Sequence, residues 1–141
     1  MTNSWQFWAL LSAGFAALTA IFAKIGIEGV NSNYATFLRT IVVVLALGAL
    51  VWATGQVQPL GMLSGRTIAF LVLSGLAAGA SWLCYFRALQ IGKPAQVAPV
   101  DKLSVVFVAI LAALFLGERL SPYGWPGVGL ISAGALLLAL S

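Results

Sequence analysis

The sequence has no histidine, one cysteine and three acidic side chains, and these shortages restrict its chemistry. Without histidine it has no His-dependent catalytic triad, and Cys84 alone cannot form a disulfide within the chain. Glu28, Asp101 and Glu118 are too few for a clustered metal site, and no glycine-rich phosphate loop is present for ATP. We therefore predict no enzyme, metal or cofactor, and a function based on binding and movement.

Charge of either sign is also scarce. Only 7% of the residues are charged, against about 25% in an ordinary soluble domain, while 62% are hydrophobic. This composition excludes a water-soluble protein. A membrane-spanning helix needs about 20 mostly apolar residues, and lipid offers the backbone no hydrogen-bond partner. The sequence thus predicts an all-α integral membrane bundle of five transmembrane helices, multi-pass in the cell membrane, here the bacterial inner membrane.

The five predicted spans form one transmembrane domain over residues 1–141. Short links rich in glycine, asparagine, serine and proline separate them, since these residues favour turns. Pro94 suits the first turn of the fourth helix, where its missing N–H would have no partner anyway. The spans cover about Trp5–Ile27, Tyr34–Trp52, Thr67–Leu89, Ala95–Leu116 and Trp125–Leu140.

The net charge is +4, but the basic residues are scattered near the ends of apolar runs, which argues against nucleic-acid binding. By the positive-inside bias, five basic residues against two place the N-terminus outside. Three of the five, Arg39, Arg87 and Lys102, lie inside predicted spans, and without them the count is two against two. Such a chain could insert in both orientations, which leaves an inverted dimer open.

Charges inside a span are costly and are functional candidates by default. Asp101 and Arg87 are expected at similar depths on neighbouring antiparallel helices, where an ion pair would offset much of that cost. Lys102 points to a different face, while Lys24 and Arg39 approach the same side of the bundle. One interpretation is a cavity that recognises a polar or anionic metabolite and relays a proton through Asp101. The other is a fixed ion pair with cations that set orientation, and the sequence leaves both open.

Aromatic side chains occupy the same part of the third predicted span. At spacings of three and four residues, Trp82 shares a helix face with Tyr85 and Phe86. Such a surface could stack on an organic substrate, and packing between helices or contact with lipid is the structural alternative. The candidate residues for substrate binding or coupling are therefore Arg87, Asp101, Lys102, Trp82, Tyr85 and Arg39.

Three segments in the last third of the chain share a distinctive order of residues. They are Ala88-Leu89-Gln90-Ile91-Gly92-Lys93-Pro94-Ala95-Gln96-Val97-Ala98-Pro99, then Leu114-Phe115-Leu116-Gly117-Glu118-Arg119-Leu120-Ser121, then Gly127-Val128-Gly129-Leu130-Ile131-Ser132-Ala133-Gly134. This order resembles the EamA-type repeat of the drug/metabolite transporter superfamily. The resemblance covers about the last 55 residues well, while the first three spans agree mainly in number and length.

The resemblance implies a five-helix repeat, of which larger relatives carry two inverted copies around a central substrate cavity. This chain resembles a single copy, like the small five-span bacterial members, so the resemblance suggests a homodimer, parallel or inverted, or a half that pairs with a different chain. The fifth span is similar to the glycine-spaced dimerisation helix of the four-span small multidrug transporters. Their first helix carries a coupling glutamate, which has no counterpart between Trp5 and Phe22 here.

We therefore expect a secondary transporter for a small metabolite or drug-like molecule, working by alternating access between two protomers in the lipid bilayer. A non-transporting membrane subunit that stabilises or orients a partner protein is the alternative. A membrane enzyme is the weakest option, because it would depend on Asp101 or Glu118 alone. The substrate, the coupling ion and the direction of transport are not written in the sequence.

Overall fold

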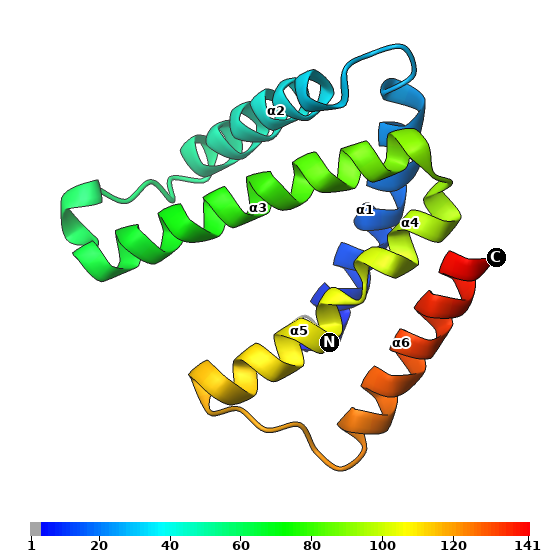
Figure 1. Ribbon diagram of the computed structural model, residues 1–141. Helices are drawn as coiled ribbons and strands as arrows, with labels where there is room; N and C mark the ends of the chain where they lie inside the picture. The colour runs from blue at the N-terminus through cyan, green and yellow to red at the C-terminus, as the bar shows by residue number, and fades with distance from the viewer. Residues whose placement is uncertain (1–3) are drawn as a thin grey trace. The chain divides into compact units, whose positions relative to one another are not determined.

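The computed structural model describes residues 4–141, and every regular element in them is helical. Figure 1 shows the helices in chain order. They are α1 (Trp5–Gly26), α2 (Ser32–Ala53), the short 3-10 helix η1 (Leu60–Met62), α3 (Gly65–Ile91), α4 (Pro94–Asp101), α5 (Ser104–Leu111), the π-helical turn η2 (Ala112–Leu116) and α6 (Gly124–Leu140). The predicted all-α class is thus confirmed.

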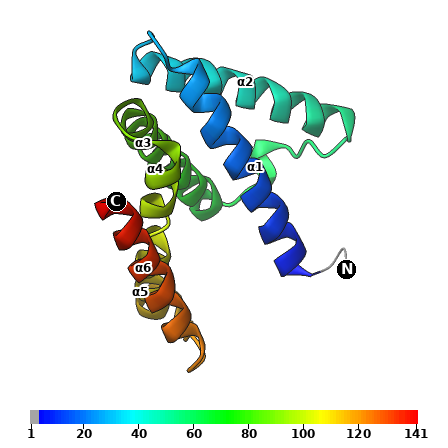
Figure 2. The same cartoon turned by 90° about the vertical axis from the view of Figure 1, so that its right-hand side faces the viewer.

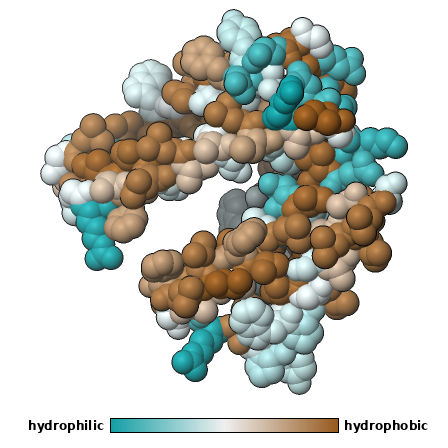
Figure 3. All heavy atoms as spheres, viewed as in Figure 1, coloured by the Kyte–Doolittle hydropathy of each residue, from teal (hydrophilic) through white to brown (hydrophobic). Residues whose placement is uncertain are grey.

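Four helical segments are long and apolar enough to cross a bilayer: α1, α2, α3 and the combined segment Pro94–Leu116. Their apolar side chains are mostly uncovered; Leu10 is 74% exposed, Leu76 67% and Leu130, on α6, 76%. In Figure 3, hydrophobic side chains cover the lengths of the visible helices and hydrophilic ones gather near helix ends. This is the distribution that a surrounding bilayer requires. Helix α6 has 17 residues, the short end of the spanning range.

Local hydrogen bonds decide where two helices begin. Asn31 caps α2 through its side-chain oxygen, which accepts from the N–H groups of Asn33 (2.9 Å) and Tyr34 (3.3 Å). At α3, the Ser64 hydroxyl oxygen accepts from the N–H of Thr67 (3.1 Å). Both helices therefore start two residues earlier than hydropathy alone predicts, because a polar cap extends a helix beyond its apolar run.

The fourth span is broken, which the sequence analysis did not predict. Pro94 takes the first position of α4, as predicted, but α4 ends at Asp101 and α5 begins at Ser104. Pro99 lies inside α4 and has no N–H for the carbonyl four residues earlier. Within one turn the bonds shorten to the i→i+3 type, from Lys102 N–H to the Pro99 carbonyl (3.1 Å) and from Leu103 N–H to the Val100 carbonyl (3.0 Å).

The described chain divides into two compact units: a first unit of residues 4–24 and 91–141 and a second unit of residues 25–90. In the first unit, α6 contacts both α4 and α5. Figures 1 and 2 both show α6 antiparallel to the broken span, with its C-terminal end beside α4. In the second unit, α2 and α3 meet through the side chains described below. The assignment of residues 1–141 to one transmembrane domain stays a prediction.

Candidate functional site

Arg39 and two aromatic rings form the best-defined side-chain cluster of the second unit. The Arg39 guanidinium carbon, on α2, lies 4.7 Å from the centre of the Trp82 ring and 5.1 Å from that of Phe86, both on α3. Trp82 and Phe86 are four residues apart and therefore share one face of α3. These distances are within cation–π range. Trp82 and Phe86 thus lie on one face of α3 as the spacing predicts, and a cation from the neighbouring helix lies over them.

The cluster is partly enclosed. Phe86 is only 3% exposed and forms its floor, whereas Arg39 and Trp82 are half-buried. Tyr85, also half-buried, is close enough to Arg39 for an electrostatic interaction. Three candidates from the sequence, Arg39, Trp82 and Tyr85, thus come together. The face shared by Trp82 and Phe86 was predictable from spacing, but the arrival of Arg39 depends on how α2 packs against α3.

Arg87 has a partner that the sequence analysis did not name. Its Nη1 donates a hydrogen bond to Oε1 of Gln90 (3.0 Å), one turn further along α3. The Gln90 Nε2 in turn donates to the carbonyl oxygen of Val30 (2.7 Å), in the link between α1 and α2. Gln90 therefore joins the end of α3 to that link and holds Arg87 at the same time. The sequence does contain a clue to this partner, because Gln90 is an amide side chain three residues after an arginine inside a span.

Asp101 and Lys102 lie at the break in the fourth span. Asp101 is the last residue of α4 and Lys102 the next, and both are exposed. Discontinuous helices of transporters place backbone groups and charges where ions and substrates bind. The break thus places two adjacent charges of opposite sign at the end of α4. Asp101 belongs to the first unit and Arg87 to the second, and their pairing stays a prediction.

Other polar groups of the first unit lie near helix ends. Lys24, in the last turn of α1, donates from Nζ to the carbonyl oxygen of Gly92 (3.0 Å), in the link between α3 and α4. Gly117 ends the π-helical turn with φ of 67°, a left-handed conformation that glycine adopts without strain. The N–H of Glu118 then donates to the Ala112 carbonyl (3.2 Å). Lys24 is therefore engaged with the backbone, and it is the Gly117 backbone that ends the helix.

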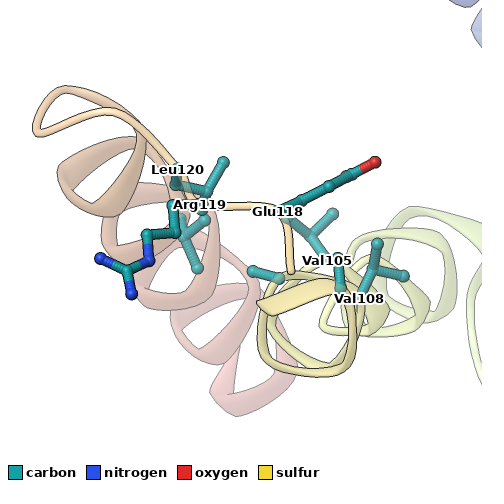
Figure 4. A pocket seen from close by; sticks show the side chains of 8 residues that line it. Val105, Val108, Glu118, Arg119 and Leu120 are labelled. Carbon is teal, nitrogen blue, oxygen red and sulfur yellow. The ribbon is translucent and has the colours of Figure 1, made fainter. Parts of the chain in front are cut away.

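A pocket of about 220 Å³ lies in the first unit, between the broken span and α6. Figure 4 shows apolar side chains lining it, with Glu118 and Arg119 pointing in opposite directions. The lining residues are Val105, Val108, Ala109, Ala112, Glu118, Arg119, Leu120 and Val128. None of the six candidate residues from the sequence contributes to it.

Fold and site together define a multi-pass α-helical membrane protein with charged and aromatic side chains inside its spans. The chain belongs to the EamA-like transporter family, which it matches over residues 3–140. This confirms the resemblance seen in the last third of the sequence and extends it to nearly the whole chain. The protein is thus a membrane transporter of the bacterial cell membrane.

Two relatives carry transport names. An uncharacterized transporter in the cobO 3′ region of a Sinorhizobium species is 61% identical over 140 residues, 99% of each chain. The probable 4-amino-4-deoxy-L-arabinose-phosphoundecaprenol flippase subunit ArnE of Aeromonas hydrophila subsp. hydrophila is 35% identical over 69 residues, 49% of this chain and 60% of that protein. Both are named as transport proteins rather than enzymes. No solved structure matches the chain.

Proposed function

We propose that the protein is a secondary transporter that moves a small metabolite or drug-like molecule by alternating access, as a homodimer. The observation that carries the proposal is the match to the EamA-like transporter family over residues 3–140, a single run of apolar helices. Secondary transporters commonly place substrate near the bilayer midplane between two repeats. One five-helix unit supplies one repeat, so a second copy would complete the passage.

The glycines of α6 support a partner copy. Helices in lipid associate through small residues that let backbones approach closely. A Cβ added to Gly127, Gly129 or Gly134 would meet no described atom of its own unit within 4 Å. These glycines are therefore not needed for packing inside that unit. Their space is open to a second protomer, in a parallel or an inverted dimer.

The side chains proposed to bind substrate or couple its movement form two groups. One is the α2–α3 cluster with its neighbour, namely Arg39, Trp82, Tyr85 and Arg87. The other is the pair at the break, Asp101 and Lys102. A charge inside a span costs roughly 3 kcal/mol on insertion scales, which favours a use beyond packing. We propose that the first group contacts substrate and that Asp101 carries the coupling proton.

Flux into proteoliposomes tests the proposal. The purified chain alone, screened with small metabolites with and without a pH gradient, is expected to transport at least one of them. Asp101→Asn should lose the response to the gradient, and Arg87→Gln should reduce uptake. Glu118→Gln is the matched carboxylate control, because Glu118 lies outside both groups, and it should behave like the parent. Full activity in both Asp101→Asn and Arg87→Gln would end their proposed roles.

A second candidate function is a membrane subunit that works only with a different protein. The name of the Aeromonas relative, a flippase subunit, favours it. Reconstituted flux from this chain alone separates the two functions. A chain that transports nothing alone, but does so when a second membrane protein is co-purified with it, would replace the homodimer by a hetero-oligomer.

A further inference from the structure

Two aromatic rings lie against the Arg39 guanidinium, and neither supplies it with a hydrogen-bond acceptor oxygen. Trp82 and Phe86 lie within 5.1 Å of the guanidinium carbon, and such rings attract the cation without accepting a directed hydrogen bond from each N–H. Among residues 4–141, the structure records no hydrogen bond or ion pair for Arg39. Its fork of N–H donors is therefore available for an additional acceptor.

The position of Arg39 makes that availability costly. Arg39 is seven residues after Ser32, about 10 Å along α2 at about 1.5 Å per residue. Inside a membrane span, donors without partners are costly because lipid supplies no hydrogen-bond acceptor. The three carboxylates of the sequence are Glu28, Asp101 and Glu118, and none is recorded as an ion-pair partner of Arg39. An acceptor from outside the chain would remove the cost.

The chemistry of that acceptor follows from the shape of the guanidinium. A planar fork of donors matches the two oxygens of a carboxylate or phosphate, which it binds through paired, charge-assisted hydrogen bonds. The half-buried indole of Trp82 lies against the guanidinium and offers apolar surface to the rest of such a molecule. An oxyanion attached to an apolar or aromatic group would satisfy both parts of the site.

We infer that Arg39, flanked by Trp82 and Phe86, is an oxyanion-binding subsite of the transporter. Its ligand is a carboxylate or phosphate ester that carries an apolar or aromatic group. This inference rests on the proposed function, for which it names the substrate class. The same chemistry occurs in a soluble metabolite and in the phosphate of a lipid headgroup.

A binding experiment that needs no transport tests the subsite. Phenyl phosphate is titrated into the purified protein in a phosphate-free sugar detergent, and the change in tryptophan fluorescence is followed. We expect saturable binding that Arg39→Gln removes. Arg39→Lys keeps the charge but loses the planar fork, and it should weaken binding about tenfold or more, the size of one charge-assisted hydrogen bond. Size-exclusion profiles of both variants check that they fold.

Arg66 provides the matched control. It too lies over an aromatic ring, 5.8 Å from the centre of Phe70, but at the beginning of α3 and with a single ring. Arg66→Gln should bind phenyl phosphate like the parent. Unchanged binding by Arg39→Gln, or equal losses in Arg39→Gln and Arg66→Gln, would overturn the inference.

Two further arms separate the possible ligands and the two proposals. If lipid headgroups use the subsite, added phosphatidic acid should displace phenyl phosphate. If phosphatidic acid does not displace it, the ligand of the subsite is a soluble molecule. If the protein transports a solute but Arg39→Gln still binds phenyl phosphate like the parent, the subsite is rejected and the proposed transport function is kept. Arg39-dependent binding without flux of any tested solute would leave the subsite and reject transport by this chain alone.

Discussion

At the residue scale, a single amide side chain carries more of the structure than its position in an apolar helix indicates. Gln90 accepts from Arg87 and donates to the Val30 carbonyl, so it satisfies a charged donor and a backbone acceptor together. Away from bulk water, an acceptor left without its donor costs more than the bond itself contributes in solution. Gln90 is therefore a positioning residue for Arg87 as well as a link between two segments.

This role predicts the effect of Gln90→Met, which keeps the side-chain length and removes the amide. The Val30 carbonyl and the Arg87 guanidinium would both lose a partner, and the free energy of unfolding should fall by about 1–3 kcal/mol. Chemical unfolding in detergent micelles measures it. Gln58→Met, in the exposed loop after α2, is the control and should change little. Equal effects of the two changes would contradict the role of Gln90.

How much of the site the sequence predicts depends on whether its residues share one helix. Trp82 and Phe86 were placed on one face because a helical repeat of 3.6 residues fixes their directions. The approach of Arg39 was not predicted, since it requires the packing of α2 on α3. The Gln90 network was missed for the same reason: its acceptor, Val30, is 60 positions away in the sequence.

At the scale of the element, the broken fourth span gives a direct prediction. Pro99→Ala would restore an N–H inside α4 and remove the clash of the ring with the preceding turn. The amides of Lys102, Leu103, Val105 and Val106, which now form i→i+3 bonds, should then exchange with solvent about fivefold more slowly, for a gain of about 1 kcal/mol. Hydrogen exchange with mass spectrometry measures this. Pro122→Ala, in the loop before α6, should leave these amides unchanged.

The start of α2 gives a second prediction at this scale. Asn31→Ala removes the side-chain oxygen that caps Asn33 and Tyr34, and it should cost about 1 kcal/mol of stability. Asn31→Asp keeps an acceptor oxygen and should lose much less. Thermal unfolding in detergent compares the two. A similar loss in both variants would mean that the link needs the amide group and not the cap.

The sequence predicts the presence of the helices better than it predicts where they start or break. Runs of apolar residues fix a helix in lipid because the backbone has no other way to satisfy its hydrogen bonds. Caps shift helix starts by a residue or two, as at Ser32 and Gly65. A proline inside a span bends or breaks it by an amount that neighbouring contacts decide, so Pro99 was visible in the sequence while the end of α4 at Asp101 was not.

At the scale of the whole molecule, the open question is what covers the glycines of α6. Gly127 and Gly134 are seven residues apart and therefore on nearly the same face of the helix. Within their unit, both have room for a side chain among the described residues. If nothing packs against this face of α6, large side chains there would be harmless. If two α6 helices meet, the same side chains would hold their backbones apart.

The double variant Gly127→Leu/Gly134→Leu distinguishes these cases. We expect it to fold and insert, yet to run as a monomer when its mass is measured in mild detergent, where the parent runs mostly as a dimer. Its flux in proteoliposomes should fall in parallel, because the passage needs both protomers. Gly48→Leu, in α2, also has room for its side chain and should leave mass and flux unchanged. A parent that is purely monomeric and still transports would refute the dimer, and the passage would then have to be sought within one chain.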